Sequence, residues 1–320
     1  MSNLEPHPDE AVSGGRATVD ERPVHEALYG REVVLGTRGL RVTRTLPHRD
    51  RRMVGAWCFV DQYGPEDIGA GPGMRVPPHP HTGLQTVSWL VSGEVFHRDS
   101  IGNRQEVRPG TLGLMTAGRG IAHAEETPPV HSPILHGVQL WVALPSDARQ
   151  VKPHFEHHAD LPRADLPGAD GVTVILGDLA GAVSPATTYS PIVGAEIVLD
   201  HRLELPLRPD FEYAVLGLSG TARVDGVPLP QGPLLYLGCG RTTLDLAGDP
   251  AGRVLLLGGE PFDEKIVMWW NFVARSHEEI VRYRDEWDSG TAFGVVAGTP
   301  LPAPPLPTTP LRPRGRTRDA

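Results

Sequence analysis

The chain has 320 residues, of which 39% are hydrophobic and 22% are charged, and its formal net charge is −9. Because single domains commonly contain about 100–200 residues, this length predicts two compact units. A chain with a net negative charge has no basic surface to attract nucleic acid phosphates, so direct nucleic acid binding is not expected. No run of about 18 apolar residues occurs, so membrane insertion is not expected either.

The two cysteines, Cys58 and Cys239, lie far apart and outside any Cys-x-x-Cys motif. This pattern argues against a disulfide framework and against a thiolate zinc site, and it favours a reducing, cytoplasmic location. Residues 1–30 are polar and acidic and have no apolar signal segment. We expect them to form a flexible leader.

Residues 31–150 are predicted to form a first β unit. The chain contains 37 Gly and 33 Pro, which here separate short apolar runs in the way that turns separate strands. The spacing favours a barrel or a double-sheet sandwich. The expected strands are Arg41 to Leu46, Trp57 to Tyr63, Gln85 to Leu90, Glu94 to Asp99, Thr111 to Thr116, Ile121 to Glu125 and His136 to Leu144.

A polar stretch, Ser146 to Gly171, is predicted to link the first unit to a second β unit within residues 151–298. Residues 213–237 of this second unit repeat, loosely, the order of apolar runs and glycine turns seen in the first unit, which suggests one topology used twice. The fold class expected is therefore all-β.

A short C-terminal helix is predicted after Ser276. Ser276 and Glu279 form a capping-box pattern, and Ile280, Tyr283 and Trp287 give an apolar stripe at positions i, i+3 and i+7. Residues 299–320 are rich in Pro and Arg and are expected to form a disordered tail.

Two pairs of metal-binding residue types stand two positions apart in the sequence: His79 with His81, and His123 with Glu125. Residues at i and i+2 of a strand share a face, so the donors of each pair can converge on one ion. Three imidazoles and a carboxylate suit one divalent ion: Fe(II), Mn, Co, Ni, Cu or Zn. Open coordination positions would allow Lewis-acid or oxygen-activating chemistry. The alternative is that these are ordinary polar residues at strand edges.

Other histidines have less support as ligands. His97 lies in a strand between the two pairs and could face the cavity as a proton shuttle or substrate contact, or serve only the structure. His201 is the only histidine between Ala159 and Ser276, so the second unit is expected to hold no metal.

The sequence from Pro78 to Gly93, with the later motifs His97 to Gly102, Met115 to Glu126 and His136 to Pro145, resembles the pirin family. The segment from Gly259 to Ile280 is similar to the weaker C-terminal signature of that family. The resemblance implies a bicupin, with two cupin-type β-barrels and a single iron-like metal ion in the N-terminal one. It also implies that the ligands are His79, His81, His123 and Glu125.

One position departs from the resemblance. Many pirins have Glu where this chain has Gln85, four residues after His81. The four ligands are unaffected, because the carboxylate ligand of pirins comes from the His-x-Glu motif. Gln85 brings neither a negative charge close to the ligands nor a carboxylate for acid/base chemistry. Glu94 and Glu126 are the other candidate carboxylates near the metal.

Two functions follow as expectations. The first is a metal-dependent dioxygenase of the quercetin 2,3-dioxygenase-like kind, because the resemblance includes such proteins and a centre of formal charge +1 favours an anionic enol or flavonol oxygen. No catalytic base is assigned. The second is a non-enzymatic regulator that responds to metal or redox state and binds a protein partner. The resemblance implies this function too, because the pirin family includes transcription cofactors and enzyme regulators.

Overall fold

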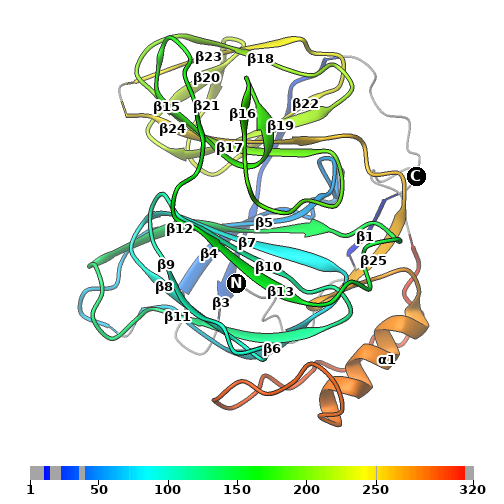
Figure 1. Cartoon of the computed structure of the whole chain (residues 1–320). Helices are drawn as coiled ribbons and strands as arrows, with labels where there is room; N and C mark the ends of the chain where they lie inside the picture. Colours follow the sequence, from blue (N-terminus) through cyan, green and yellow to red (C-terminus); the bar gives the residue numbers. More distant parts are fainter. Residues whose placement is uncertain (1–10, 15–22, 36–39, 72, 250, 314–320) are drawn as a thin grey trace.

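The computed structural model describes residues 11–14, 23–35, 40–71, 73–249 and 251–313. Its regular structure consists of strands and one α-helix, arranged as two β units that lie one above the other (Figure 1). The all-β class and the short C-terminal helix predicted from the sequence are confirmed. No helix in the described part of the chain is long and apolar enough to cross a membrane.

The first unit consists of two antiparallel sheets. A seven-stranded sheet has the order β13-β10-β7-β12-β5-β4-β3, and a four-stranded sheet has the order β6-β11-β8-β9. Among the described residues, strand pairing joins each sheet internally and does not join the two sheets, so the expected barrel takes the form of a double sheet. The strands are β3 Arg31–Leu35, β4 Leu40–Leu46, β5 Trp57–Asp67, β6 Arg75–His81, β7 Leu84–Ser92, β8 Val95–Asp99, β9 Arg104–Val107, β10 Leu112–Thr116, β11 Ile121–Glu126, β12 Ile134–Ala143 and β13 His154–His158.

The second unit repeats this arrangement. Its sheet order β22-β19-β24-β17 matches β10-β7-β12-β5, and its order β18-β23-β20-β21 matches β6-β11-β8-β9. The loose repeat in the sequence therefore reflects one topology used twice. The strands are β2 Glu26–Leu28, β14 Arg163–Ala164, β15 Ala169–Leu179, β16 Ala182–Val183, β17 Ile192–Leu199, β18 Leu203–Pro206, β19 Glu212–Ser219, β20 Ala222–Val224, β21 Val227–Leu229, β22 Leu234–Gly238, β23 Thr243–Gly248 and β24 Arg253–Gly259.

The interiors of the two units differ at equivalent strands. In the first unit, β6 and β11 pair His79 with His123. In the second unit, β18 and β23 pair Leu205 with Leu244, and both leucines are fully buried in an apolar cluster. Leucine side chains thus occupy the place in the second unit that histidine side chains occupy in the first.

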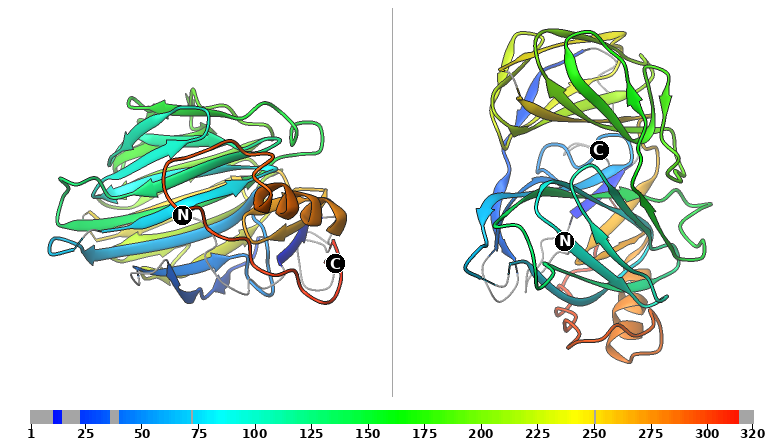
Figure 2. Two further views of the ribbon diagram at one scale, coloured as in Figure 1. Left: turned by 90° about the horizontal axis from the view of Figure 1, so that it is seen from below. Right: turned by 60° about the vertical axis from the view of Figure 1, so that its left-hand side comes forward.

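Segments near both ends of the chain cross between the units. Strand β2 pairs with β22 in the second unit, and the blue segment after β2 leads down to β3 in the first unit (Figure 2, right). Strands β1 Ala11–Gly14, β25 Lys265–Trp269 and β26 Phe272–Ala274 form a third sheet. An isolated bridge joins Phe272 of β26 to Thr82, the residue after β6. The C-terminal region is therefore attached to the end of β6 in the first unit.

The predicted leader, residues 1–30, and tail, residues 299–320, differ from the structure in their described parts. Leu28 is buried in the main core, because β2 completes an edge of the second sheet. Leu311 is buried near the helix, and Leu301 and Leu306 pack on the same cluster. These leucines give both segments a fixed place, which their polar composition does not predict; residues 1–10, 15–22 and 314–320 lie outside the described residues. The boundaries at 150 and 298 stay predictions.

Helix α1 His277–Asp288 begins where the capping box places it. The Ser276 hydroxyl accepts the Glu279 amide at 3.3 Å, and Ile280 and Tyr283 are buried. These apolar residues contact Trp269, Phe272 and Phe293 in one cluster. The helix therefore covers the small third sheet beside the first unit (Figure 2, left).

Candidate metal centre

Strands β6 and β11 are hydrogen-bonded neighbours, with His79 opposite His123 and His81 opposite Ile121. Because side chains alternate along a strand, His79, His81 and His123 share one face. The pairing register shifts between His123 and Glu125. Such a bulge changes the direction of a side chain relative to the strand. All four side chains predicted as ligands are buried in the first unit.

Two glycines make turns next to these strands, one after β6 and one before β11. Gly83 follows His81 with φ +68°, and an added Cβ would lie 2.2 Å from the Val273 carbonyl oxygen. Gly118 precedes β11 with φ +51°, and its added Cβ would lie 2.0 Å from the Val151 oxygen. Both positions need a left-handed backbone conformation at a close backbone contact, so glycine is required there.

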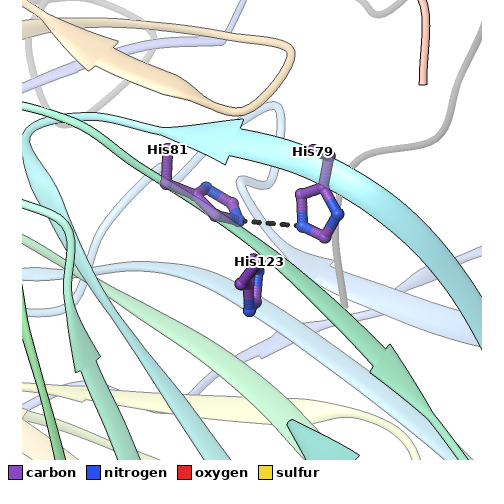
Figure 3. Close-up of side chains that lie close together, drawn as sticks. All are labelled: His79, His81 and His123. Atoms are coloured by element: carbon purple, nitrogen blue, oxygen red, sulfur yellow. Dashed lines mark hydrogen bonds between the residues drawn. The ribbon is translucent and has the colours of Figure 1, made fainter. Parts of the chain in front are cut away.

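The hydrogen bonds of His79 and His81 determine which ring nitrogens carry protons. His79 Nδ1 lies 2.8 Å from the Pro77 carbonyl oxygen, and His81 Nδ1 lies 3.0 Å from the Asn271 carbonyl oxygen. A carbonyl oxygen can only accept, so both Nδ1 atoms donate and both Nε2 atoms present lone pairs. Those two Nε2 atoms are 3.1 Å apart (Figure 3). Two lone pairs this close repel each other, and a cation bound to both would remove the repulsion.

His123 completes the group. The ring nitrogens of His79, His81 and His123 lie within 4.8 Å of one another, and His123 Nε2 is buried without a hydrogen-bond partner in the described part of the chain. Burial lowers the pKa of His79 to about 4 and lowers the pKa values of His81 and His123 well below the ordinary value. The three imidazoles are therefore neutral near pH 7, as metal ligands must be. This donor set fits a divalent ion.

Glu125 is not part of this three-histidine group. Its carboxylate, His123 and His97 form a second group whose ligand atoms are within 4.8 Å of one another. The Ser88 hydroxyl on β7 donates to Glu125 Oε1 at 3.0 Å. His123 is thus shared between the three-histidine group and a group that contains the carboxylate.

The interior of the seven-stranded sheet supplies further side chains. Gln139 Oε1 lies 3.1 Å from Ser88 Oγ, and Gln139 Nε2 has no hydrogen-bond partner among the described residues. The Trp141 ring lies edge-on to His81, with ring centroids 5.1 Å apart. The imidazoles are therefore surrounded by the aromatic ring of Trp141 and by the buried amide of Gln139, whose Nε2 can still donate a hydrogen bond.

The structure also places the residues whose roles the sequence left open. Gln85 points away from the Ser88 face of β7, and its amide donates to Thr116 Oγ1 at 2.9 Å and to the Thr187 oxygen at 3.0 Å. Position 85 therefore contributes to packing between the units, not to the surroundings of the imidazoles.

Neither alternative carboxylate reaches the imidazoles. Glu126 pairs with Arg75 and Arg98, and Glu94 accepts from Ser132. Sequence analysis missed the contributions of Ser88 and Asn271. The i, i+2 pattern gives no signal for Ser88, and the Asn271 carbonyl comes from a residue 190 positions after His81.

Comparisons with known proteins agree with this arrangement. The Pirin family model matches residues 39–142, and the model of the Pirin C-terminal cupin domain matches residues 193–294. A Pseudomonas aeruginosa protein named "Putative quercetin 2,3-dioxygenase" is 48% identical over 96% of this chain and 98% of its own length. A "Pirin-like protein" of Caulobacter vibrioides is 35% identical over 78% of this chain and 88% of its own length.

Solved structures include one with a similar fold throughout. A crystal structure of quercetin 2,3-dioxygenase from Acinetobacter baumannii superposes with a TM-score of 0.85 at 39% identity, covering 89% of this chain and 96% of that one. The shared fold therefore extends over both β units.

Proposed function

This chain belongs to the pirin family of the cupin superfamily, and from that premise we propose that it is a metal-dependent dioxygenase of the quercetin 2,3-dioxygenase-like kind. The observation that carries the proposal is the convergence of unprotonated Nε2 atoms from His79 and His81 beside the unpartnered Nε2 of His123. The names of two similar proteins support the reaction class.

We assign the metal to His79, His81, His123 and Glu125, with Fe(II) as the preferred ion. Hydrogen bonds to backbone carbonyls hold His79 and His81 in position, and Ser88 orients the carboxylate of Glu125. One carboxylate and three neutral imidazoles leave a formal charge of +1 on a divalent centre. That charge favours an anionic oxygen ligand such as a deprotonated enol or flavonol hydroxyl. When bound, the ion supplies Lewis-acid activation of such a hydroxyl and redox access to dioxygen.

The chain's own residues do the binding and orienting. The Trp141 ring, nearly perpendicular to His81 and stacked on Phe59, gives the ligands an apolar neighbour that holds the His81 ring in place. The Gln139 amide has a polar atom free to form a hydrogen bond with a substrate oxygen. Burial of the ligands excludes water, which strengthens electrostatic interactions at the centre.

Oxygen consumption tests this proposal. Purified protein loaded separately with Fe, Mn, Co, Ni or Cu is mixed with flavonols in air, and dioxygen uptake is followed with an electrode. We expect uptake with at least one metal, and its loss in His79→Ala. The exposed His201 in the second unit provides a matched control, since His201→Ala should keep full activity.

No uptake with any of the five metals, in protein shown by elemental analysis to be loaded, would overturn the dioxygenase proposal. The same result would favour the alternative function, a metal-responsive regulator with a protein partner. In that case His79→Ala should change partner binding and not turnover.

A further inference from the structure

We propose that Asp99 and His97 form a positioning relay that holds His123 in the tautomer with its proton on Nδ1 and its lone pair on Nε2. The relay extends the proposed function, because it prepares His123 as a metal ligand. It acts through His123, so Asp99 and His97 are positioning residues and need no contact with substrate.

The relay begins at Asp99, whose side chain is fully buried at the end of β8. Its Oδ1 accepts the backbone amides of Ile101 and Asn103 at 3.1 and 2.9 Å. Its Oδ2 accepts the Asn103 side-chain amide at 2.8 Å and lies 3.2 Å from His97 Nε2. A carboxylate surrounded by donors is acceptor-only, so His97 must donate from Nε2.

His97 passes this constraint to His123. With its proton on Nε2, neutral His97 has a lone pair on Nδ1, and that atom lies 3.4 Å from His123 Nδ1. The ring of His97 is buried and stacks on Phe155 of β13, with centroids 4.2 Å apart and planes at 14°. The stacking fixes the plane in which the lone pair points. His123 therefore lowers its energy by donating from Nδ1, which leaves its Nε2 unprotonated.

Each of the three imidazoles of the centre has an acceptor opposite its Nδ1 atom, but the acceptor opposite His123 is of a different kind. His79 and His81 donate to backbone carbonyls, which can never become donors. His123 faces another imidazole, which can either accept or donate at Nδ1. The Asp99 carboxylate removes this ambiguity by accepting from Nε2 of His97, so a change at Asp99 should reverse both tautomers.

The main test is Asp99→Asn, which preserves shape while replacing one acceptor oxygen with an NH₂ donor. The two backbone amides at Oδ1 retain the remaining oxygen, so the new NH₂ group faces His97 Nε2. His97 should then carry its proton on Nδ1, and His123 should move its proton to Nε2 and lose its ligand lone pair. Affinity for Zn(II) or Ni(II), measured by chelator competition, should fall about 10- to 100-fold.

Glu126→Gln is the matched control for the loss of one carboxylate charge. Glu126 lies on β11 and pairs outward with Arg75 and Arg98, so its amide variant should bind metal within about twofold of the unchanged protein. A second pair of variants separates the acceptor from packing. His97→Gln can place a carbonyl oxygen against His123 Nδ1 and should retain most of the affinity, whereas His97→Leu fills space without an acceptor and should lose it.

The tautomers themselves are read by long-range ¹H–¹⁵N imidazole spectra of the metal-free protein. We expect His123 to be protonated at Nδ1 in the unchanged protein and at Nε2 in Asp99→Asn. This readout needs neither metal nor turnover, so failure of the dioxygenase proposal would leave it intact. The relay is overturned if His123 keeps one tautomer in both proteins. It is also overturned if His97→Gln and His97→Leu lose affinity equally, and this pair decides the matter should Asp99→Asn not fold.

Discussion

At the scale of single residues, the candidate centre is defined by where protons lie. Backbone carbonyls take the Nδ1 protons of His79 and His81, and burial keeps the rings neutral. The i, i+2 spacing predicted that these side chains share a face, because strand periodicity is a local property. It could not predict which nitrogen would be free, because that depends on a carbonyl from Asn271, far away in the chain.

Removal of a ligand should empty the centre. His79→Ala takes away one of the two Nε2 atoms that lie 3.1 Å apart. We expect metal content, measured by elemental analysis after dialysis, to fall from about one ion per chain to near zero, because each lost ligand removes a direct bond. Retention of a full equivalent of metal would contradict the ligand assignment.

Acid should destabilise the metal-free protein in a defined range. The pKa of His79 is about 4 in the folded protein because of burial, against 6.5 for an ordinary histidine. Between these values the unfolded chain binds a proton that the folded chain does not, so stability falls as the pH is lowered from about 6.5 to about 4. We expect a loss of about 1–3 kcal/mol from this residue in urea titrations.

His79→Gln is the control for this titration. Without the imidazole, the decline in stability over the same pH range should become shallower. Equal slopes for both proteins would show that His79 keeps an ordinary pKa in the fold. Because the imidazoles stay neutral when folded, bound metal should also be retained at pH 5.

At the scale of elements, the turns and the strand pairing bring the ligands together. Glycine-rich turns next to both ligand pairs could be recognised from the sequence, and the structure shows why two of them need glycine. The bulge that redirects Glu125 and the stacking of Phe155 on His97 could not be recognised. Phe155 belongs to β13, which lies in a polar stretch with the composition of a linker and is ordered by pairing with β10.

Gly83→Ala tests the turn after β6. Its φ of +68° strains any side chain, and its Cβ would meet the Val273 oxygen at 2.2 Å. Gly110→Ala is the control, with φ +79° and no atom within 4 Å. We expect a loss of about 1–2 kcal/mol for Gly110→Ala from backbone strain alone, and at least about 2 kcal/mol more for Gly83→Ala. Equal losses in chemical denaturation would refute the close contact.

At the scale of the whole molecule, the two β units share one core. Trp57 of the first unit is fully buried and donates its indole N–H towards the carbonyl oxygens of Val193 and Gly258, at 3.1 and 3.2 Å. The Glu212 carboxylate of the second unit accepts from the Gly55 amide at 2.6 Å. The repeated topology could be inferred from the order of glycine turns, but these contacts join residues more than 130 positions apart and leave no local signal.

Trp57→Phe should therefore weaken both units together. The smaller ring leaves a void and removes the indole donor, so we expect a loss of about 1–3 kcal/mol in a single cooperative unfolding transition. Trp287→Phe on α1 also removes an indole donor, which bonds the Leu301 oxygen at 2.8 Å outside the interface. It should cost less. Two separate transitions in the Trp57 variant would contradict a common core.

The central claim is that one metal ion binds between His79, His81, His123 and Glu125. Anomalous diffraction at the absorption edge of the loaded metal tests it most directly. The account predicts one peak per chain, about 2.0–2.3 Å from the Nε2 atoms of the three histidines, with the Glu125 carboxylate completing the ligands. A peak at another position, or no peak in crystals whose protein contains a full equivalent of metal, would contradict it.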